Sequence, residues 1–234
     1  TLHCFQGFQF ALFPRRGGYP PELDNLDNLL ILGRTVGHIH AVGRAASFSE
    51  RQQITVDRML TRNREFLLEG FIPRELIPAY ESLTLDLLQT VESIYSDVQS
   101  QDLIRVHGDC HVGNILWRDD TAHFVDLDDS CTAPAIQDLW MFLNGERHDR
   151  QLQLSELIEG YSEFCDFDPR QIRWIEALRT MRLIHYAAWL ARRWEDPAFP
   201  RSFTWFNTER YWADHILELR EQMSALQEEP LQLL

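Results

Sequence analysis

The sequence predicts an α+β protein that is mostly helical, with one small β insertion near its middle. Over most of the 234 residues, apolar side chains recur at the three- and four-residue spacing of helices that bury one face. Between residues 102 and 129, short apolar runs separated by turn residues replace that spacing. The composition, 44% hydrophobic and 25% charged, is typical of a globular chain that can bury a core without disulfide or metal staples.

Helical spacing is clearest on either side of the insertion. Asp168 followed by Pro169 predicts a helix start, because an Asp cap precedes a proline whose missing N–H costs nothing in the first turn. The predicted helices are Glu22 to Arg44, Ile54 to Leu68, Ile72 to Val98, Ala135 to Leu143, Leu152 to Phe164, Pro169 to Trp194 and Glu209 to Leu226.

Strand-like patterns occupy the start and the middle of the chain. Cys4 to Phe13 alternates aromatic and polar residues, which predicts a strand that ends at Pro14. Leu103 to Val106 is a short apolar run, and Asn114 to Trp117 and Ala122 to Leu127 flank a turn. We therefore expect the last two to form a hairpin, in a loop region of the kind that often carries function.

Charge and hydropathy argue against several classes of protein. The net charge of −14 argues against a nucleic-acid binder or a binder of anionic membranes. No apolar run approaches the ~18 residues of a membrane span, and no signal-peptide pattern is present. The four cysteines are far apart, so we expect reduced thiols in a cytoplasmic protein. All 22 cationic residues are Arg, which excludes any mechanism that needs a lysine from these residues.

The insertion contains the residues that phosphoryl transfer requires. It has the sequence V-H-G-D-C-H-V-G-N-I-L-W-R-D-D-T-A-H-F-V-D-L-D-D from Val106 to Asp129. A hairpin would bring Asp109, Asn114 and Asp126 into one small region. Amide and carboxylate oxygens suit Mg²⁺ bridged by phosphates rather than zinc. Asp109 would then be free to accept a proton from an attacking hydroxyl.

Other interpretations of this loop stay open. It could be only a solvated polar hairpin. His107 and His111 lie four residues apart, as in helical zinc pairs, although Gly108 and Gly113 argue against a helix there. Cys110, beside the proposed base, could be sensitive to oxidation.

The motif also resembles a known family. H-x-D-x-x-x-x-N followed by an Asp on the next strand is similar to the protein-kinase catalytic loop. The version H-G-D-x-H-x-G-N with D-L-D-D resembles the aminoglycoside-phosphotransferase and choline-kinase branch, and the wider text resembles the bacterial stress response kinase A family. That likeness is weakest at residues 45–100. It is carried by His107 to Trp117, Phe124 to Asp129, Pro134 to Leu143, Leu178 to Trp194, Asp196 to Pro200 and Pro230 to Leu233.

The resemblance implies a protein-kinase-like fold and a role for each motif residue. Asp109 would be the catalytic proton acceptor. Asn114 and Asp126 would be the Mg²⁺ ligands, and Asp126 would also be a catalytic residue. Leu116 would form an apolar floor under the adenine of ATP, the co-substrate.

Two further residues would support the loop. The resemblance implies that His107 braces the loop without reacting. It also implies that Asp138, on the following helix, hydrogen-bonds the loop and has a structural role.

The family has a small N-terminal lobe with a phosphate-covering loop and a lysine, and this sequence contains neither feature. Phe5 to Phe13 resembles the last strand of that lobe. We therefore expect residues 1–14 to be the last N-lobe strand and the start of the hinge. Residues 15–234 would be a mostly helical C-lobe with its catalytic loop at 106–129. With the N-lobe absent and Thr as its first residue, the chain is expected to be part of a longer protein and inactive alone.

The function that follows is an ATP-dependent kinase that transfers phosphate to Ser or Thr of a protein during stress response. The protein substrate, which can be the chain itself, and the stress role come only from the resemblance. We expect a monomer with no nucleic-acid or membrane partner. One alternative is a small-molecule kinase acting on choline, an amino alcohol or an aminoglycoside. The other is a non-catalytic C-lobe that binds partners. The acidic net charge would attract a cationic protein substrate and a cationic small molecule alike. It therefore does not distinguish a protein kinase from a small-molecule kinase.

Overall fold

The computed structural model describes residues 2–234, so residue 1 of the predicted segment 1–14 lies outside the described residues. Helices dominate, and the described residues form three separate two-stranded antiparallel sheets. The α+β class predicted from the sequence is confirmed. The elements are β1 (Leu2–Phe5), β2 (Phe8–Ala11), α1 (Leu26–Gly43), α2 (Arg62–Gly70), α3 (Ile77–Tyr95), β3 (Leu103–Val106), β4 (Ile115–Arg118), β5 (Thr121–Phe124), β6 (Cys131–Pro134), α4 (Arg147–Ser162), α5 (Ile175–Arg192), α6 (Ala198–Ser202) and α7 (Glu209–Ala225).

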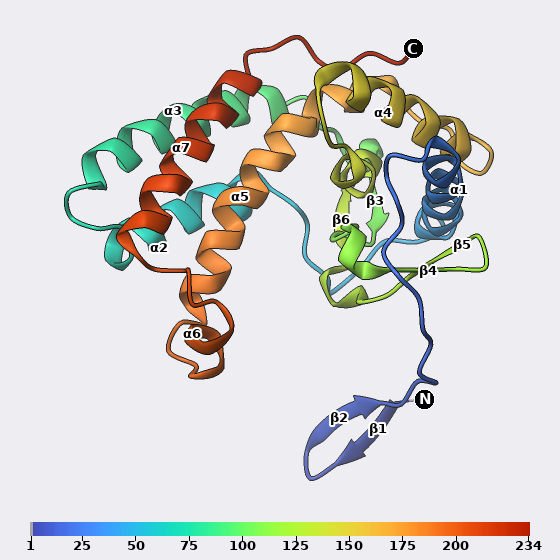
Figure 1. Cartoon of the computed structure of the whole chain (residues 1–234), viewed down its shortest axis with the longest axis horizontal. Coiled ribbons are helices and arrows are strands. Elements are labelled where there is room, and N and C mark those ends of the chain that lie inside the picture. The colour runs from blue at the N-terminus through green and yellow to red at the C-terminus, as the bar shows by residue number, and fades with distance from the viewer. Residues whose placement is uncertain (1) are drawn as a thin grey trace.

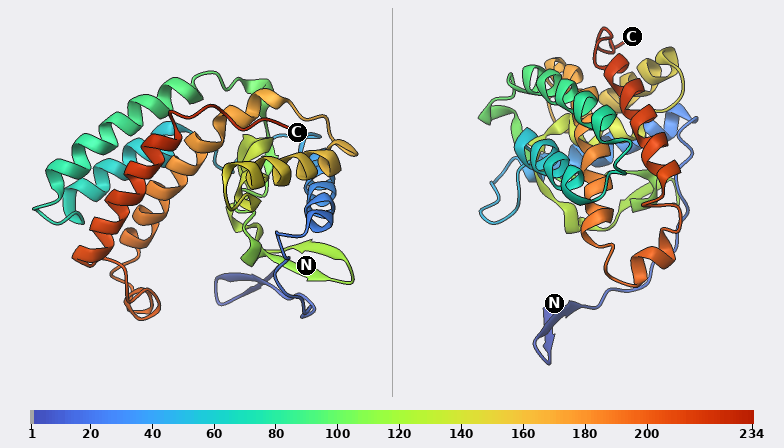
Figure 2. Two further views of the ribbon diagram at one scale, coloured as in Figure 1. Left: turned by 45° about the horizontal axis from the view of Figure 1, so that its top comes forward. Right: turned by 90° about the vertical axis from the view of Figure 1, so that its left-hand side faces the viewer.

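The helices form two groups on either side of the small central sheets (Figures 1 and 2). Helices α2, α3, α5 and α7 pack on one side, and α1 packs along α4 on the other. The strand pairs β3–β6 and β4–β5 lie beside α1 (Figure 1). Residues of the loop that joins β3 to β4 line a cavity together with residues of α5.

Two glycines let α1 and α4 approach closely. A Cβ on Gly160 would collide with the backbone carbonyl oxygen of Leu30, and one on Gly33 would collide with that of Leu157. This contact matters for the site because α1 carries the fully buried His40, and α4 carries Tyr161, whose hydroxyl lies 3.1 Å from the His40 ring nitrogen Nδ1.

Two predicted elements were wrong. The single strand over Cys4 to Phe13 is instead the hairpin β1–β2, because Gln6 and Gly7 both take positive φ (49° and 83°), as in a tight turn between antiparallel strands. The predicted helix Ala135 to Leu143 is two short 3₁₀ turns, 135–138 and 140–142. Tertiary hydrogen bonds hold this buried segment: the N–H of Ile136 donates to the side chain of Gln171, 3.1 Å away.

The remaining predicted elements are confirmed with shifted ends, and three were missed. The predicted central hairpin is β4–β5, whose turn residues Asp119 and Asp120 both have φ of 52°. Strand β6, the short helix α6 and the backbone pairing of Gln52–Ile54 with Thr132 have no clear sequence signal. None of the described helices is long and apolar enough to cross a membrane.

Candidate active site

A buried carboxylate fixes the loop between β3 and β4. Asp138 accepts hydrogen bonds from the backbone N–H groups of His107 (2.7 Å) and Gly108 (2.8 Å). His40 Nε2 donates a third bond, at 2.9 Å. Burial alone would raise the pKa of Asp138, but the hydrogen bond and charge of His40 and the two backbone donors outweigh it and lower that pKa. The structure therefore has the contact predicted for Asp138, with His40 as an additional partner.

Gly108 forms the tight turn of this loop. Its φ is +90°, and a Cβ there would collide with the backbone carbonyl oxygen of Asp129. The Gly108 carbonyl oxygen accepts a hydrogen bond from Gln137 Nε2 at 2.9 Å. The turn is thus held from both sides and aims the next residue, Asp109, into a cavity.

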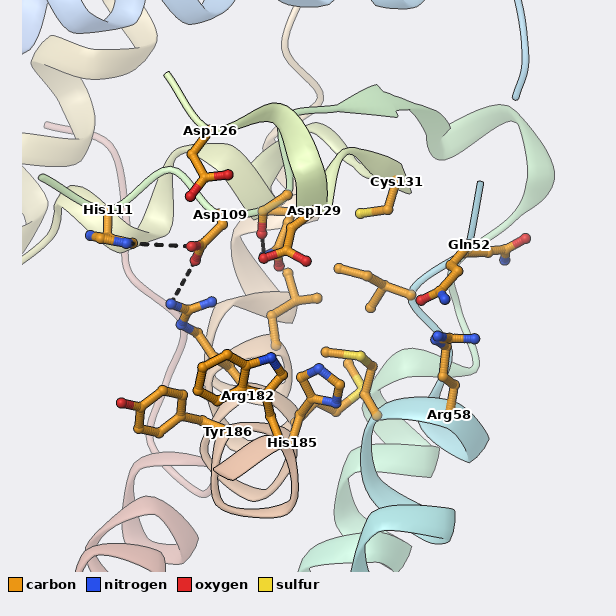
Figure 3. Close-up of a pocket in the computed structure, with 18 residues that line it drawn as sticks. Gln52, Arg58, Asp109, His111, Asp126, Asp129, Cys131, Arg182, His185 and Tyr186 are labelled. Atoms are coloured by element: carbon orange, nitrogen blue, oxygen red, sulfur yellow. Dashed lines mark hydrogen bonds and ion pairs between the residues drawn. The ribbon is translucent and has the colours of Figure 1, made fainter. Parts of the chain in front are cut away.

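Asp109 lies at the centre of the site (Figure 3). Its Oδ1 is 2.6 Å from Nη2 of Arg182, on α5. Its Oδ2 accepts a hydrogen bond from Asn114 Nδ2 at 3.1 Å and lies 3.4 Å from His111 Nε2. Asn114 Nδ2 also donates to the Asp109 backbone carbonyl at 3.0 Å. The structure thus brings together Asp109 and Asn114, as the spacing predicted.

Asp126 follows β5 and faces the same cavity (Figure 3). It takes the left-handed conformation (φ 64°, ψ 68°) and is exposed. Its carboxylate has no hydrogen bond or ion pair within residues 2–234. His107 Nε2 donates to the carbonyl of the preceding residue, Val125, at 2.9 Å, which matches the bracing contact expected of it.

The oxygen atoms here suit a divalent metal held partly by phosphates. Asn114 donates through its nitrogen, so its amide oxygen remains free, and the carboxylate of Asp126 is unpartnered. Burial, together with the charges of Asp109 and Asp126, raises the pKa of the neighbouring Asp129. Across the described part of the chain, no group of three or more His, Cys, Asp or Glu side chains could hold a metal. A metal bridged by phosphates needs only one or two protein ligands, so the residues fit such an ion and not a zinc cluster.

Leu116 lies away from the cavity, on β4. The backbone of Gly18 runs over it, and a Cβ on Gly18 would come within 2.7 Å of the Leu116 Cβ. The next residue, Tyr19, pairs with Trp117 through two backbone hydrogen bonds (3.2 and 2.8 Å). The segment after the predicted hinge is therefore fastened to the strand that carries Leu116.

A cavity of about 310 Å³ opens beside Asp109. Its walls come from three segments that are far apart in the sequence: the loop of Asp109, the residues before α2, and helix α5 (Figure 3). The sequence interpretation missed the second and third walls. They contribute Gln52, Gln53, Ile54, Arg58 and Met59, and Leu178, Met181, Arg182, His185, Tyr186 and Trp189.

Residues 1–175 match the phosphotransferase enzyme family (APH). The chain belongs to this family. It is 45% identical over 234 residues to Stress response kinase A of Escherichia coli strain K12, covering the whole chain and 70% of that protein. It is 44% identical over 235 residues, with the same coverage, to the "Serine/threonine protein kinase RdoA" of Salmonella typhimurium. The predicted resemblance is therefore confirmed.

Solved structures show the same fold at low identity. An amicoumacin kinase in complex with AMP-PNP and Ca²⁺ aligns with a TM-score of 0.66 and 16% identity, over 94% of this phosphotransferase and 64% of that chain. A microcompartment-associated aminopropanol kinase aligns with a TM-score of 0.63 and 13% identity, over 100% and 74%. The kinase-like fold predicted from the motif is confirmed.

Proposed function

We propose that this chain is the larger lobe of an ATP-dependent kinase that phosphorylates Ser or Thr of a protein. The observation that carries the proposal is that Asp109 and the unpartnered Asp126 line one cavity, while Asn114 donates a hydrogen bond to the Asp109 carboxylate from behind it. The names of the 44–45% identical relatives, a stress response kinase and a serine/threonine protein kinase, support a protein acceptor and a role in stress.

Asp109 would act as the proton acceptor. The acceptor hydroxyl oxygen forms a bond to the γ-phosphorus of ATP, the bond from that phosphorus to the β–γ bridging oxygen breaks, and ADP leaves. The hydroxyl proton goes to a carboxylate oxygen of Asp109, which the Asn114 amide and the Gly108 turn hold in position.

Asn114 and Asp126 would hold Mg²⁺ through their free oxygens. The ion, when bound, supplies positive charge that offsets the negative charge of the phosphates. Leu116 would contact the adenine, since it is a partly exposed apolar side chain beside the hinge segment.

The division of the chain would follow the predicted one, with residues 1–14 in the smaller lobe and 15–234 in the larger. Every residue of β1 and β2 is exposed, and the hairpin extends away from the helical body (Figure 1). We place the protein in the cytoplasm as a monomer.

A small-molecule acceptor is the second candidate. The cavity volume of about 310 Å³ is at the lower end of the range of small-ligand sites. The solved kinases that share the fold act, by their names, on amicoumacin and on aminopropanol.

The test is phosphotransfer from labelled ATP by the complete kinase, with its smaller lobe, and by its Asp109→Asn variant. We expect Asp109→Asn to lower kcat by roughly 10²- to 10⁴-fold with little change in the KM for ATP, because only proton transfer is lost. Asp120→Asn is the matched control, since Asp120 is exposed in the β4–β5 turn and lines no part of the cavity. Full activity of Asp109→Asn would refute the assignment of the base.

A further inference from the structure

The walls of the cavity differ in charge. Its three acidic lining residues, Asp109, Asp126 and Asp129, all belong to the loop side described above. The facing walls, 52–59 and α5, contribute two arginines and a histidine and no carboxylate. The inference that follows rests on the proposed function. If the acceptor hydroxyl lies at Asp109, the neighbouring part of the acceptor lies against these facing walls.

Arg58 is a half-buried cation without a partner. It lines the cavity, and its guanidinium makes no hydrogen bond or ion pair with any residue from 2 to 234. Arginine is seldom removed from water without a partner, because desolvating a charge costs free energy that an anion normally offsets. An unpaired guanidinium on the wall of a cavity therefore points to an anionic ligand.

The neighbouring His185 is held as a neutral hydrogen-bond donor. One N–H of Asn63 Nδ2 is shared between the carbonyls of Arg58 and Met59, which leaves the other N–H for a further acceptor. Asn63 Oδ1 accepts from Arg192 Nη1 at 2.7 Å, so the orientation of this amide is determined. The same Nδ2 lies 3.0 Å from His185 Nδ1, which must then be the acceptor. The proton of a neutral His185 is consequently on Nε2.

Electrostatics keep His185 neutral. Burial and the charges of Arg192, Arg58, Arg182 and Arg193 lower the pKa of His185 to about 4. At neutral pH this side chain therefore adds an N–H donor to the wall beside Arg58, and no acceptor. The four arginines around His185 also give this part of the protein a local positive charge, although the net charge of the chain is −14.

Arg182 connects this wall to the proposed base. Its 2.6 Å ion pair with Asp109 Oδ1 occupies the carboxylate oxygen that faces α5. Asp109 thus offsets the charge of Arg182, which leaves Arg58 as the cation of the facing walls without a partner among the described residues.

We propose that the cavity takes an acceptor that carries a carboxylate or phosphate near its reacting hydroxyl, with the hydroxyl at Asp109 and the anionic group held by Arg58 with a hydrogen bond from His185. The group transfer is the one given above, with the hydroxyl proton passing to Asp109 and ADP leaving. The proposal favours anionic acceptors over the cationic small molecules that the net charge of the chain did not exclude. Choline, aminoglycosides and amino alcohols would bring a positive charge to a positively charged wall. An acidic Ser/Thr peptide and a free hydroxy acid are the two sources of this chemistry.

The experiment compares acceptors of matched size with the complete kinase, smaller lobe included, and labelled ATP. The peptide arm uses one serine flanked by glutamates, by glutamines or by arginines. The small-molecule arm uses glycerate, glycerol and choline. We expect kcat/KM to be highest for the glutamate-flanked peptide or for glycerate, by about tenfold or more over the neutral analogue, because a charged hydrogen bond is gained. The arm that responds identifies the source.

The Arg58→Gln variant tests the residue. We expect it to raise the KM for the anionic acceptor by about tenfold while the KM for ATP stays unchanged. Arg62→Gln is the matched control, because Arg62 is 71% exposed, pairs with Asp57 and does not line the cavity. Preference for the arginine-flanked peptide or choline, or an unchanged KM in Arg58→Gln, would overturn the proposal.

Binding without ATP separates this inference from the proposed function. Titration calorimetry measures the affinity of the glutamate-flanked peptide and of glycerate for the wild-type and Arg58→Gln chains. Binding that weakens about tenfold in Arg58→Gln supports an anion site even if no phosphate is transferred, in which case the proposed function alone fails. Equal or absent binding of both anionic probes in the two chains would refute the anion site.

Discussion

At the scale of single residues, Asp138 and His185 are opposite solutions to burying an ionisable group. Asp138 stays charged because three donors surround it. His185 stays neutral because burial disfavours its charged form and four arginines lie nearby. The first side chain gives the loop of Asp109 its shape, and the second gives the facing wall a donor.

The lowered pKa of His185 predicts a pH dependence of stability. In the folded chain it stays neutral down to about pH 4, whereas in the unfolded chain it takes up a proton near pH 6.5. The unfolded state therefore binds more protons between those values, so stability is fully present above pH 6.5 and falls as the pH drops towards 4. We expect a loss of about 2 kcal/mol between pH 7 and pH 5 from this group.

Urea unfolding of the wild-type chain and of His185→Gln at pH 7 and pH 5 measures this contribution. Glutamine keeps a polar group of similar length but does not titrate. The loss of unfolding free energy between pH 7 and pH 5 should be smaller in His185→Gln than in the wild-type chain by about 2 kcal/mol. An equal loss in the two chains would contradict a neutral buried His185.

At the scale of elements, the contact between α1 and α4 positions the catalytic loop from behind. The helices approach through Gly33 and Gly160, and this closeness brings His40 and Tyr161 together beneath Asp138. The loop that holds Asp109 thus depends on a helix pair that contributes nothing to the cavity itself.

Gly160→Ala should destabilise the chain by about 2–4 kcal/mol, because the added methyl meets the rigid backbone carbonyl of Leu30 rather than a movable side chain. The free energy of urea unfolding measures the loss. Gly70→Ala is the control, since no atom lies within 4 Å of the Cβ it would add at the end of α2. Equal stabilities of the two variants would show that the helices can separate at little cost.

At the scale of the whole molecule, the helical body and the N-terminal hairpin are distinct. The body brings residues 52–59, 107–129 and 178–189 around one cavity. The hairpin β1–β2 and the chain as far as residue 20 are exposed throughout. The two parts therefore depend on each other little for stability.

Removal of residues 1–14 should change the free energy of unfolding by less than about 0.5 kcal/mol, because no buried side chain is lost. Removal of residues 226–234 is the contrasting variant. It deletes the buried Leu226 and Leu231 and the carbonyl of Pro230 that Arg147 binds, and should cost about 3 kcal/mol or more. A large loss on removing 1–14 would contradict the proposed division of the chain.

The sequence alone determined the helical body, the central hairpin and the convergence of Asp109 with Asn114, because each depends on spacing within a short stretch of chain. Helical periodicity and turn residues are local properties, and Asp109 and Asn114 lie only five positions apart in the loop before β4. The same local reasoning failed at Cys4 to Phe13, where the pattern did not reveal a turn at Gln6 and Gly7.

Only the tertiary structure decided the wall that faces Asp109 and the way the loop is held. Arg58, Arg182 and His185 come from two segments that are far apart in the sequence and carry no shared motif, and His40 reaches Asp138 across 98 positions of the chain. The charge of the cavity is set by which side chains the packing of helices places together, and the net charge of −14 gave no sign of it. Chain spacing determines the chemistry of the loop, whereas packing between distant elements determines the acceptor side of the cavity.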